Sequence, residues 1–325
     1  MARTSTLRFD RGTLILHPPP RGKGWIDHAI WDDRIERFRI PAHCYRPLIE
    51  ALRRDQMAIN DQASDFKSLE LSPQLTFEPY AHQREALKAW QQNRWQGVVV
   101  LPTAAGKTYL AQLALQAIPR SALITVPTLD LMHQWYAHLE TAFPDADIGL
   151  LGGGSRDRSD ILVATYDSAA IHAENLGNRY GLLVCDECHH LPSDFNRVIA
   201  EYAIAPYRLG LTATPDRADG RHADLDQLLG PVVYHKTAAE LSGLALAPYQ
   251  IVQLKVSLSE IERRRYAELI QQRNDFLQKS RIWLSSPEGW KRFVGASARS
   301  QEGRRAMLAH REAKNIALGT AGKLK

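Results

Sequence analysis

The 325-residue sequence has few cysteines, no long apolar run and no apolar leader. Its three cysteines, Cys44, Cys185 and Cys188, are too few and too unevenly spaced for a disulfide framework, which predicts a reducing compartment. No apolar run reaches the roughly 18 residues that a membrane span needs, and the start lacks the hydrophobic segment of a signal peptide. We therefore expect a cytoplasmic protein with no membrane partner, and the sequence does not indicate its oligomeric state.

The sequence also lacks the low apolar content that would predict disorder, since 44% of its residues are hydrophobic. The net charge of +5 is unevenly spread. Residues 251–325 hold 16 Lys and Arg against 7 Asp and Glu, a balance of +9, which leaves −4 for the rest. A basic segment beside a slightly acidic body is typical of a protein that binds nucleic acid. A solvated helical surface would show the same pattern.

Three segments differ in pattern. Residues 1–75 read as a small mixed α/β unit, with a hairpin that turns at residues 10–12, a second strand at 35–40 and an amphipathic helix at 45–54. Residues 236–325 combine a connecting strand with a basic, helix-forming extension.

Residues 76–235 alternate short apolar runs with longer amphipathic stretches. Near-continuous apolar strands between helices predict a parallel sheet that is covered on both faces. We therefore expect a doubly wound α/β domain, with strands at residues 98–101, 122–126, 161–164, 182–185 and 207–211.

A candidate phosphate-binding loop follows the first of these runs. Residues 101–106 are small or apolar and lead straight into Lys107, Thr108 and a helical stretch. Free backbone N–H groups and the positive end of a helix suit a phosphate. Lys107 would reach the β- and γ-phosphates and Thr108 would ligate Mg²⁺. The match to the P-loop pattern is imperfect because Leu101 takes the first glycine position, and Gly-Lys-Thr alone also occurs in ordinary turns.

Two carboxylates follow the run at residues 182–185. Ligands of open α/β sheets bind outside the carboxyl ends of the strands, where Asp186 and Glu187 are expected to lie. Asp186 is predicted to hold Mg²⁺, and Glu187 to orient and deprotonate the attacking water. Acidic residues also favour helix starts, but that does not explain their position after a buried strand. The C-x-x-C-H pattern of residues 185–189 also occurs in haem-attachment and zinc sites. Because Cys185 ends a predicted core strand, we expect neither group to bind here.

Together these motifs resemble those of superfamily 2 helicases, in particular the XPB-like branch, over about residues 77–220. Residues 186–189 resemble a DEAH-type motif, and the loop resembles motif I, with alanine at position 104 where relatives usually have glycine. The resemblance implies a RecA-like P-loop fold, ATP and Mg²⁺ as cofactors, and DNA, duplex or single-stranded, as the partner. It implies catalytic roles for Lys107, Asp186, Glu187 and His189. The ATP-contacting residues would be Pro102, Thr103, Ala104, Ala105, Gly106, Lys107 and Thr108.

Further motifs add expected contacts. Gln83 matches the residue that reads the adenine edge, although a plain surface helix start would look the same. Residues 211–215 resemble motif III, in which Thr212 and Thr214 would couple the γ-phosphate site to the DNA surface; a strand-end turn is the alternative. Short hydroxyl side chains at strand ends suit contacts with a phosphate backbone. The expected nucleic-acid contacts are Pro127, Thr128, Thr165 and Tyr166.

Only one RecA-like domain fits the sequence, whereas helicases of this family close two around ATP and take an arginine finger from the second. Residues 301–305 nearly match the finger motif but read as an Arg-rich helix. We expect a fragment of a DNA helicase or translocase with weak or no turnover. Residues 1–75 resemble a damage-recognition unit, which suggests DNA repair, with a repair nuclease among the candidate partners. The alternatives are a DNA-binding scaffold without ATP turnover and another P-loop enzyme such as a small-molecule kinase.

Overall fold

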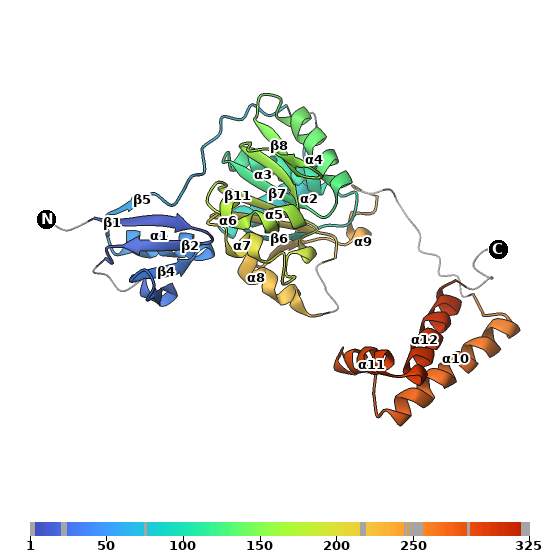
Figure 1. Cartoon of the computed structure of the whole chain (residues 1–325). Coiled ribbons are helices and arrows are strands. Elements are labelled where there is room, and N and C mark those ends of the chain that lie inside the picture. The colour runs from blue at the N-terminus through green and yellow to red at the C-terminus, as the bar shows by residue number, and fades with distance from the viewer. Residues whose placement is uncertain are drawn as a thin grey trace. The chain divides into compact units, whose positions relative to one another are not determined.

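The computed structural model divides the chain into two compact units, Met1–Pro248 and Tyr249–Lys325 (Figure 1). It describes residues 4–20, 25–74, 77–214, 219–243, 245, 247, 256–284 and 287–319.

The first part of the chain forms a five-stranded sheet with one helix, α1 (Tyr45–Arg54), packed on it. The predicted hairpin is confirmed, because β1 pairs antiparallel with β2 and Asp10 lies opposite Thr13. Arg11 and Gly12 both have positive φ, +47° and +86°, as a two-residue hairpin turn needs. The strands are β1 (Ser5–Asp10), β2 (Thr13–His17), β3 (Ile30–Asp32), β4 (Arg37–Pro41) and β5 (Ile59–Asp61), in the order β3-β4-β2-β1-β5.

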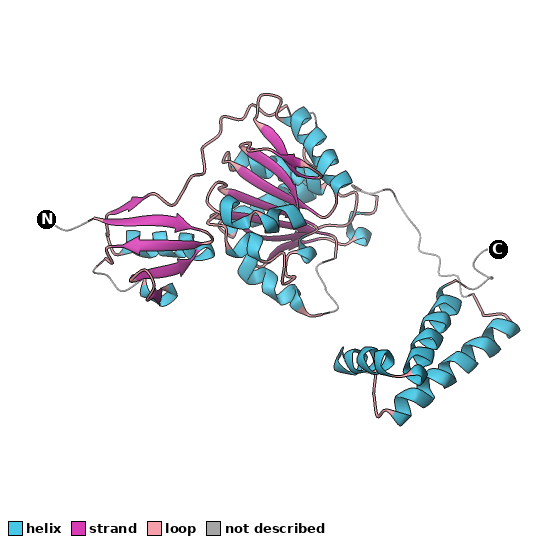
Figure 2. Ribbon diagram, in the orientation of Figure 1, coloured by secondary structure: helices cyan, strands magenta, loops and turns pink. Residues whose placement is uncertain are grey.

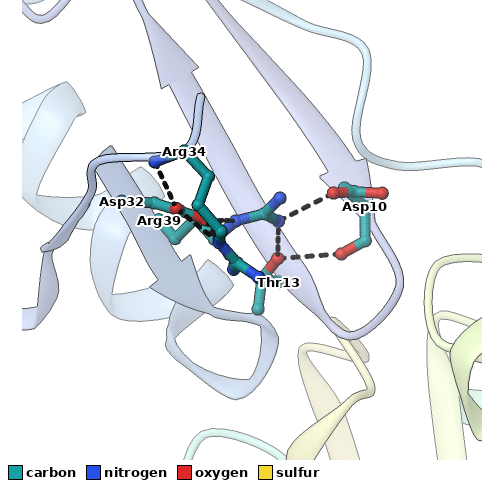
Figure 3. Close-up of polar contacts among 5 residues, drawn as sticks. All are labelled: Asp10, Thr13, Asp32, Arg34 and Arg39. Atoms are coloured by element: carbon teal, nitrogen blue, oxygen red, sulfur yellow. Dashed lines mark hydrogen bonds and ion pairs between the residues drawn. The ribbon is translucent and has the colours of Figure 1, made fainter. Parts of the chain in front are cut away.

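One guanidinium ties this sheet together (Figure 3). Arg39 on β4 donates to Asp10 at the end of β1 (2.7 Å), to Thr13 on β2 (2.7 Å) and to Asp32 on β3 (2.8 Å). Arg34 also binds Asp32, through two side-chain hydrogen bonds of 3.0 Å. Four strands therefore share one charged network.

The central domain, residues 77–241, contains the predicted parallel sheet. Its order is β13-β6-β12-β11-β7-β10-β8-β9, and every pairing except β8 with β9 is parallel. All five predicted strands are present, and β8, β9 and β13 are additional. The strands are β6 (Gln96–Val100), β7 (Ala122–Val126), β8 (Ile148–Gly152), β9 (Ser155–Arg156), β10 (Ile161–Thr165), β11 (Leu182–Asp186), β12 (Tyr207–Thr212) and β13 (Val232–His235).

Helices cover both faces of this sheet (Figure 2). Alternate strand residues point to opposite sides, so Val99 and Val184 join one core and Val98 and Leu183 the other. The first core also contains α2 (Ala81–Gln92), α3 (Lys107–Ala117), α4 (Leu129–Ala142) and α9 (Ala238–Leu241). The second contains α5 (Tyr166–Ile171), α6 (Ala173–Leu176), α7 (Val198–Glu201) and α8 (Leu225–Leu228). The doubly wound fold is therefore confirmed.

The N-terminal sheet and the central domain share buried contacts. Ile204, just before β12, is 1% exposed and packs into the core of the N-terminal sheet. Arg46 on α1 donates to the carbonyls of Arg94 (2.7 Å) and Pro206 (2.9 Å). A side chain at Gly12 would overlap the Tyr202 ring, so the hairpin turn needs glycine for closeness as well as for φ. The predicted boundary at residue 75 stays a prediction.

The second unit is helical, as expected, with α10 (Glu260–Lys279), α11 (Pro287–Arg299) and α12 (Gln301–Leu318). Residues 301–305 lie at the start of α12, in agreement with their assignment to an Arg-rich helix. No connecting strand occurs between residues 236 and 319 where the chain is described, and residues 248–255 lie outside the described part. None of the described helices is both long and apolar enough to cross a membrane.

Asp32 gives the N-terminal sheet a predicted pH dependence. Its hydrogen bonds with Arg34 and Arg39 hold the pKa of Asp32 well below its ordinary value. Such a carboxylate stabilises the fold above its unfolded-state pKa, about 4, and loses this contribution as the pH falls. We expect Asp32→Asn to be less stable than the parent at neutral pH, with a difference that shrinks below about pH 4. Urea unfolding across this pH range measures it, and a pH-independent difference would contradict the interpretation.

Candidate active site

The predicted phosphate loop joins β6 to α3. Gly106 caps α3 with φ of +79°, a conformation that favours glycine. A side chain at this position would also overlap the Gln83 amide. Ala104 has φ of +65°, which costs a residue with a Cβ roughly 1–2 kcal/mol. The loop therefore has a left-handed backbone conformation at Ala104, the position where the family resemblance leads us to expect glycine.

The predicted carboxylates lie beside this loop. Asp186 ends β11 and is 7% exposed. The Lys107 Nζ atom lies 3.4 Å from Glu187 Oε1. Glu187 itself has φ of +47°, a strained conformation of the kind that clusters at functional sites. Lys107 and Glu187, 80 positions apart in the sequence, thus meet at one edge of the sheet, as the motifs predict.

Asp186 is held by three hydrogen bonds. Trp135 Nε1 donates to Oδ2 at 2.9 Å, and the Glu187 amide donates to Oδ1 at 3.0 Å. The Tyr166 hydroxyl donates to the backbone carbonyl of Asp186 at 2.8 Å. Burial raises the pKa of Asp186, and the Trp135 hydrogen bond acts in the opposite direction. Sequence reasoning missed Trp135, because a tryptophan in an amphipathic helix looks like an ordinary core residue.

Glu187 is connected to the predicted coupling residue Thr212. The Thr212 hydroxyl lies 3.2 Å from Glu187 Oε2 and 3.0 Å from His189 Nδ1. A hydroxyl has one proton, so when Thr212 donates to Glu187 the His189 Nδ1 atom has to be the donor to Thr212. Thr214 donates its backbone N–H to the same hydroxyl at 3.1 Å. Pro215, the last residue of this motif, lies outside the described residues.

Gln83, the expected reader of the adenine edge, makes two hydrogen bonds within the protein. Gln83 is 2% exposed, and its Oε1 accepts from the Tyr80 amide at 2.9 Å. Its Nε2 donates to the Gly106 carbonyl at 3.2 Å. Gln83 also lines the cleft described below, and its expected bidentate contact with a base stays a prediction. As described, Gln83 fastens the start of α2 to the phosphate loop.

The expected nucleic-acid residues lie at the ends of the neighbouring strands β7 and β10. Thr128 is exposed and caps α4, while Thr165 is 9% exposed and caps α5. Pro127 is half-buried. Tyr166 is 3% exposed and its hydroxyl is bonded to the Asp186 carbonyl, and its expected contact with DNA stays a prediction.

A cleft of about 850 Å³ opens over the phosphate loop, a volume within the range of small-molecule sites. Its lining includes Thr103, Ala104, Gly106, Lys107, Thr108, Asp186 and Glu187. In the described part of the chain, no three His, Cys, Asp or Glu side chains form a ready metal cage. Mg²⁺ commonly binds through one or two protein ligands and substrate phosphates, so the donors present fit a Mg²⁺–nucleotide complex.

Two family models match the chain. Residues 76–217 match the model described as "Type III restriction enzyme, res subunit". Residues 7–63 match the "Xeroderma pigmentosum group B helicase damage recognition domain". The two matches cover most of the central domain and most of the N-terminal sheet respectively.

Three curated relatives carry helicase or translocase names. The chain is 38% identical over 294 residues to "DNA 3'-5' translocase XPB2" of Sulfurisphaera tokodaii, covering 90% of this chain and 66% of the relative. It is 32% identical to "DNA 3'-5' helicase XPB" of Mycobacterium tuberculosis, and this match covers 53% of this chain and 33% of the relative. It is 39% identical to "Putative DNA 3'-5' helicase Rad25" of Haloarcula marismortui, and this match covers 42% of this chain and 23% of the relative. The chain thus spans at most about two thirds of the length of these relatives.

The phosphate loop allows a test with opposite expectations at two nearby positions. Gly106→Ala places a Cβ in a left-handed conformation and against Gln83, so we expect it to lower the free energy of unfolding by about 1–2 kcal/mol. Ala104→Gly removes strain, so we expect no loss or a gain of up to about 1 kcal/mol. Urea unfolding compares the two. Equal losses in both variants would show that these backbone conformations do not limit stability.

Proposed function

Because the chain belongs to the XPB-like family of superfamily 2 helicases, we propose that it binds ATP with Mg²⁺ at Lys107 and couples hydrolysis to movement on DNA or to DNA opening. The observation that carries this proposal is the 3.4 Å approach of Lys107 Nζ to Glu187, beside the buried Asp186. A phosphate loop, a lysine and two carboxylates meeting at one sheet edge are what phosphoryl transfer requires.

Each residue of the site has a role in this proposal. The backbone N–H groups at the start of α3 and the Lys107 ammonium would hold the phosphates. Thr108 and Asp186 would hold Mg²⁺, which neutralises charge that develops on the phosphate oxygens. Phosphates would draw Lys107 from Glu187 and leave the Glu187 carboxylate to accept a proton from the attacking water. Thr212 and His189 would keep that carboxylate oriented.

DNA is the proposed partner. Thr128 and Thr165 cap helices at adjacent strand ends, and backbone N–H groups at helix starts suit a phosphate backbone. The basic balance of residues 251–325 would add sequence-independent attraction. The match of residues 7–63 to a damage recognition domain supports a role in DNA repair, and a repair nuclease is a candidate protein partner.

The first test of this function is nucleotide binding. We expect Lys107→Ala to weaken binding of a fluorescent ATP analogue with Mg²⁺ by at least tenfold, since the lysine is the cation at the phosphates. Glu187→Gln should retain binding and abolish hydrolysis, because an amide cannot accept the proton. Lys88→Ala, at an exposed lysine of α2, is the control. Equal affinity of Lys107→Ala and the parent would favour a DNA-binding scaffold without ATP chemistry.

The second test is turnover. The described residues hold a single RecA-like sheet, and loss of an arginine finger from a second domain costs about 10³–10⁵ in rate. We expect DNA-stimulated ATP hydrolysis by these 325 residues to be slower by this order than hydrolysis by a full-length relative. A phosphate-release assay with and without duplex DNA measures it. Fast DNA-stimulated turnover would contradict the expectation, and polymer-independent phosphoryl transfer would favour a small-molecule kinase.

A further inference from the structure

Two aromatic donors reach Asp186 from opposite faces of the central sheet. Trp135, on α4, donates its indole N–H to the carboxylate at 2.9 Å. Tyr166, the first residue of α5, donates its hydroxyl to the backbone carbonyl at 2.8 Å. Trp135 is 2% exposed and Tyr166 is 3% exposed, so water does not compete for either bond. A buried polar contact of this kind is costly to break and fixes the orientation of its partners.

The helices that carry these donors begin at the proposed DNA contacts. Thr128 caps α4, and Trp135 lies seven residues further, about two helical turns along the same helix. Thr165 caps α5 and directly precedes Tyr166. The strands that lead into these caps are neighbours, since Thr165 pairs with Val126 in the parallel sheet. One proposed DNA surface is therefore linked to one residue by two short routes, through Trp135 to the Asp186 carboxylate and through Tyr166 to its backbone carbonyl.

We propose that Trp135 and Tyr166 are positioning residues that connect DNA contact at the starts of α4 and α5 to the Mg²⁺ ligand Asp186. This inference rests on the proposed function. A strand that binds at Thr128 and Thr165 restrains both helix starts, and the two aromatic donors then restrain the Asp186 carboxylate and carbonyl. Nucleotide with Mg²⁺ and DNA would each bind better in the presence of the other, because coupling between two sites is reciprocal.

Outer-shell partners of metal ligands have measurable effects. Their removal typically costs about 10- to 100-fold in metal affinity or activity. Trp135 acts on the carboxylate itself, so its removal should weaken Mg²⁺ binding with the nucleotide. Tyr166 acts on the backbone beside it, so its removal should mainly weaken the coupling to DNA. A residue that only filled the core would change neither quantity.

The central domain offers a matched control for each donor. Trp90 is 1% exposed, lies in the same core as Trp135 and donates its indole N–H to the Arg208 carbonyl at 2.8 Å. Tyr180 is 3% exposed, lies in the same core as Tyr166 and donates to the Ser159 carbonyl at 3.2 Å. Trp90→Phe and Tyr180→Phe therefore remove the same groups from equally buried rings, away from Asp186.

The experiment uses the full chain and Trp135→Phe, Tyr166→Phe and the two controls. Binding of a fluorescent ATP analogue is titrated over Mg²⁺ concentration, with and without a DNA duplex, and each melting temperature is recorded. We expect Trp135→Phe to raise the half-saturating Mg²⁺ concentration about tenfold or more. In Tyr166→Phe, the factor by which DNA tightens nucleotide binding should fall towards one. The control variants should match the parent in both quantities.

Several results would overturn the inference. It fails if Trp135→Phe and Trp90→Phe show the same Mg²⁺ dependence, or if DNA tightens nucleotide binding equally in Tyr166→Phe and Tyr180→Phe. Tyr166→Phe removes one oxygen atom, so it keeps the test usable if Trp135→Phe does not fold. Lys107→Ala separates the two proposals. If it binds as the parent does, the proposed function fails; if it loses binding while the aromatic variants behave normally, only this inference fails.

Discussion

The parallel register of β6, β12 and β11 is the constraint on which the candidate site depends. Val100 pairs with Thr212, and Leu211 pairs with Asp186, so all three strands end at the same level. The phosphate loop leaves β6 there, and the carboxylates leave β11 there. Hydrogen bonds between strands thus set the distance from Lys107 to Glu187, and the helices on both faces keep water from that ladder. A slip of one residue would separate the lysine from the acids.

Much of this arrangement could be predicted from sequence because its causes are local. A short apolar run such as residues 182–185, between Gly181 and Asp186, predicts a buried strand from its length and its flanking residues. The turn at Arg11 and Gly12 was predictable for the same reason, since two positive φ angles are a property of the turn itself. Convergence of Lys107 with Asp186 followed from the rule that parallel strands end at one edge.

The remaining features depend on tertiary contacts that no local pattern shows. Trp135 looks like a core residue, and only the fold brings its indole N–H to Asp186. Gln83 matches a base-reading residue, and only the fold shows that its amide also bonds Tyr80 and Gly106. Strand β8 was missed because it contains glycines that usually indicate turns. Gly149 is needed there, since a side chain would overlap Ser159.

Ile204 shows how closely the two folded parts of the first unit depend on each other. This side chain belongs by sequence to the central domain, yet it completes the core of the N-terminal sheet. The core of the N-terminal sheet therefore includes a side chain from outside the sheet. Separation of the two parts would expose apolar surface on both, around Ile204 and on the sheet that it contacts. Transfer of the N-terminal sheet to another protein would require matching changes in both contact surfaces. We therefore expect the sheet and the central domain to be inherited together.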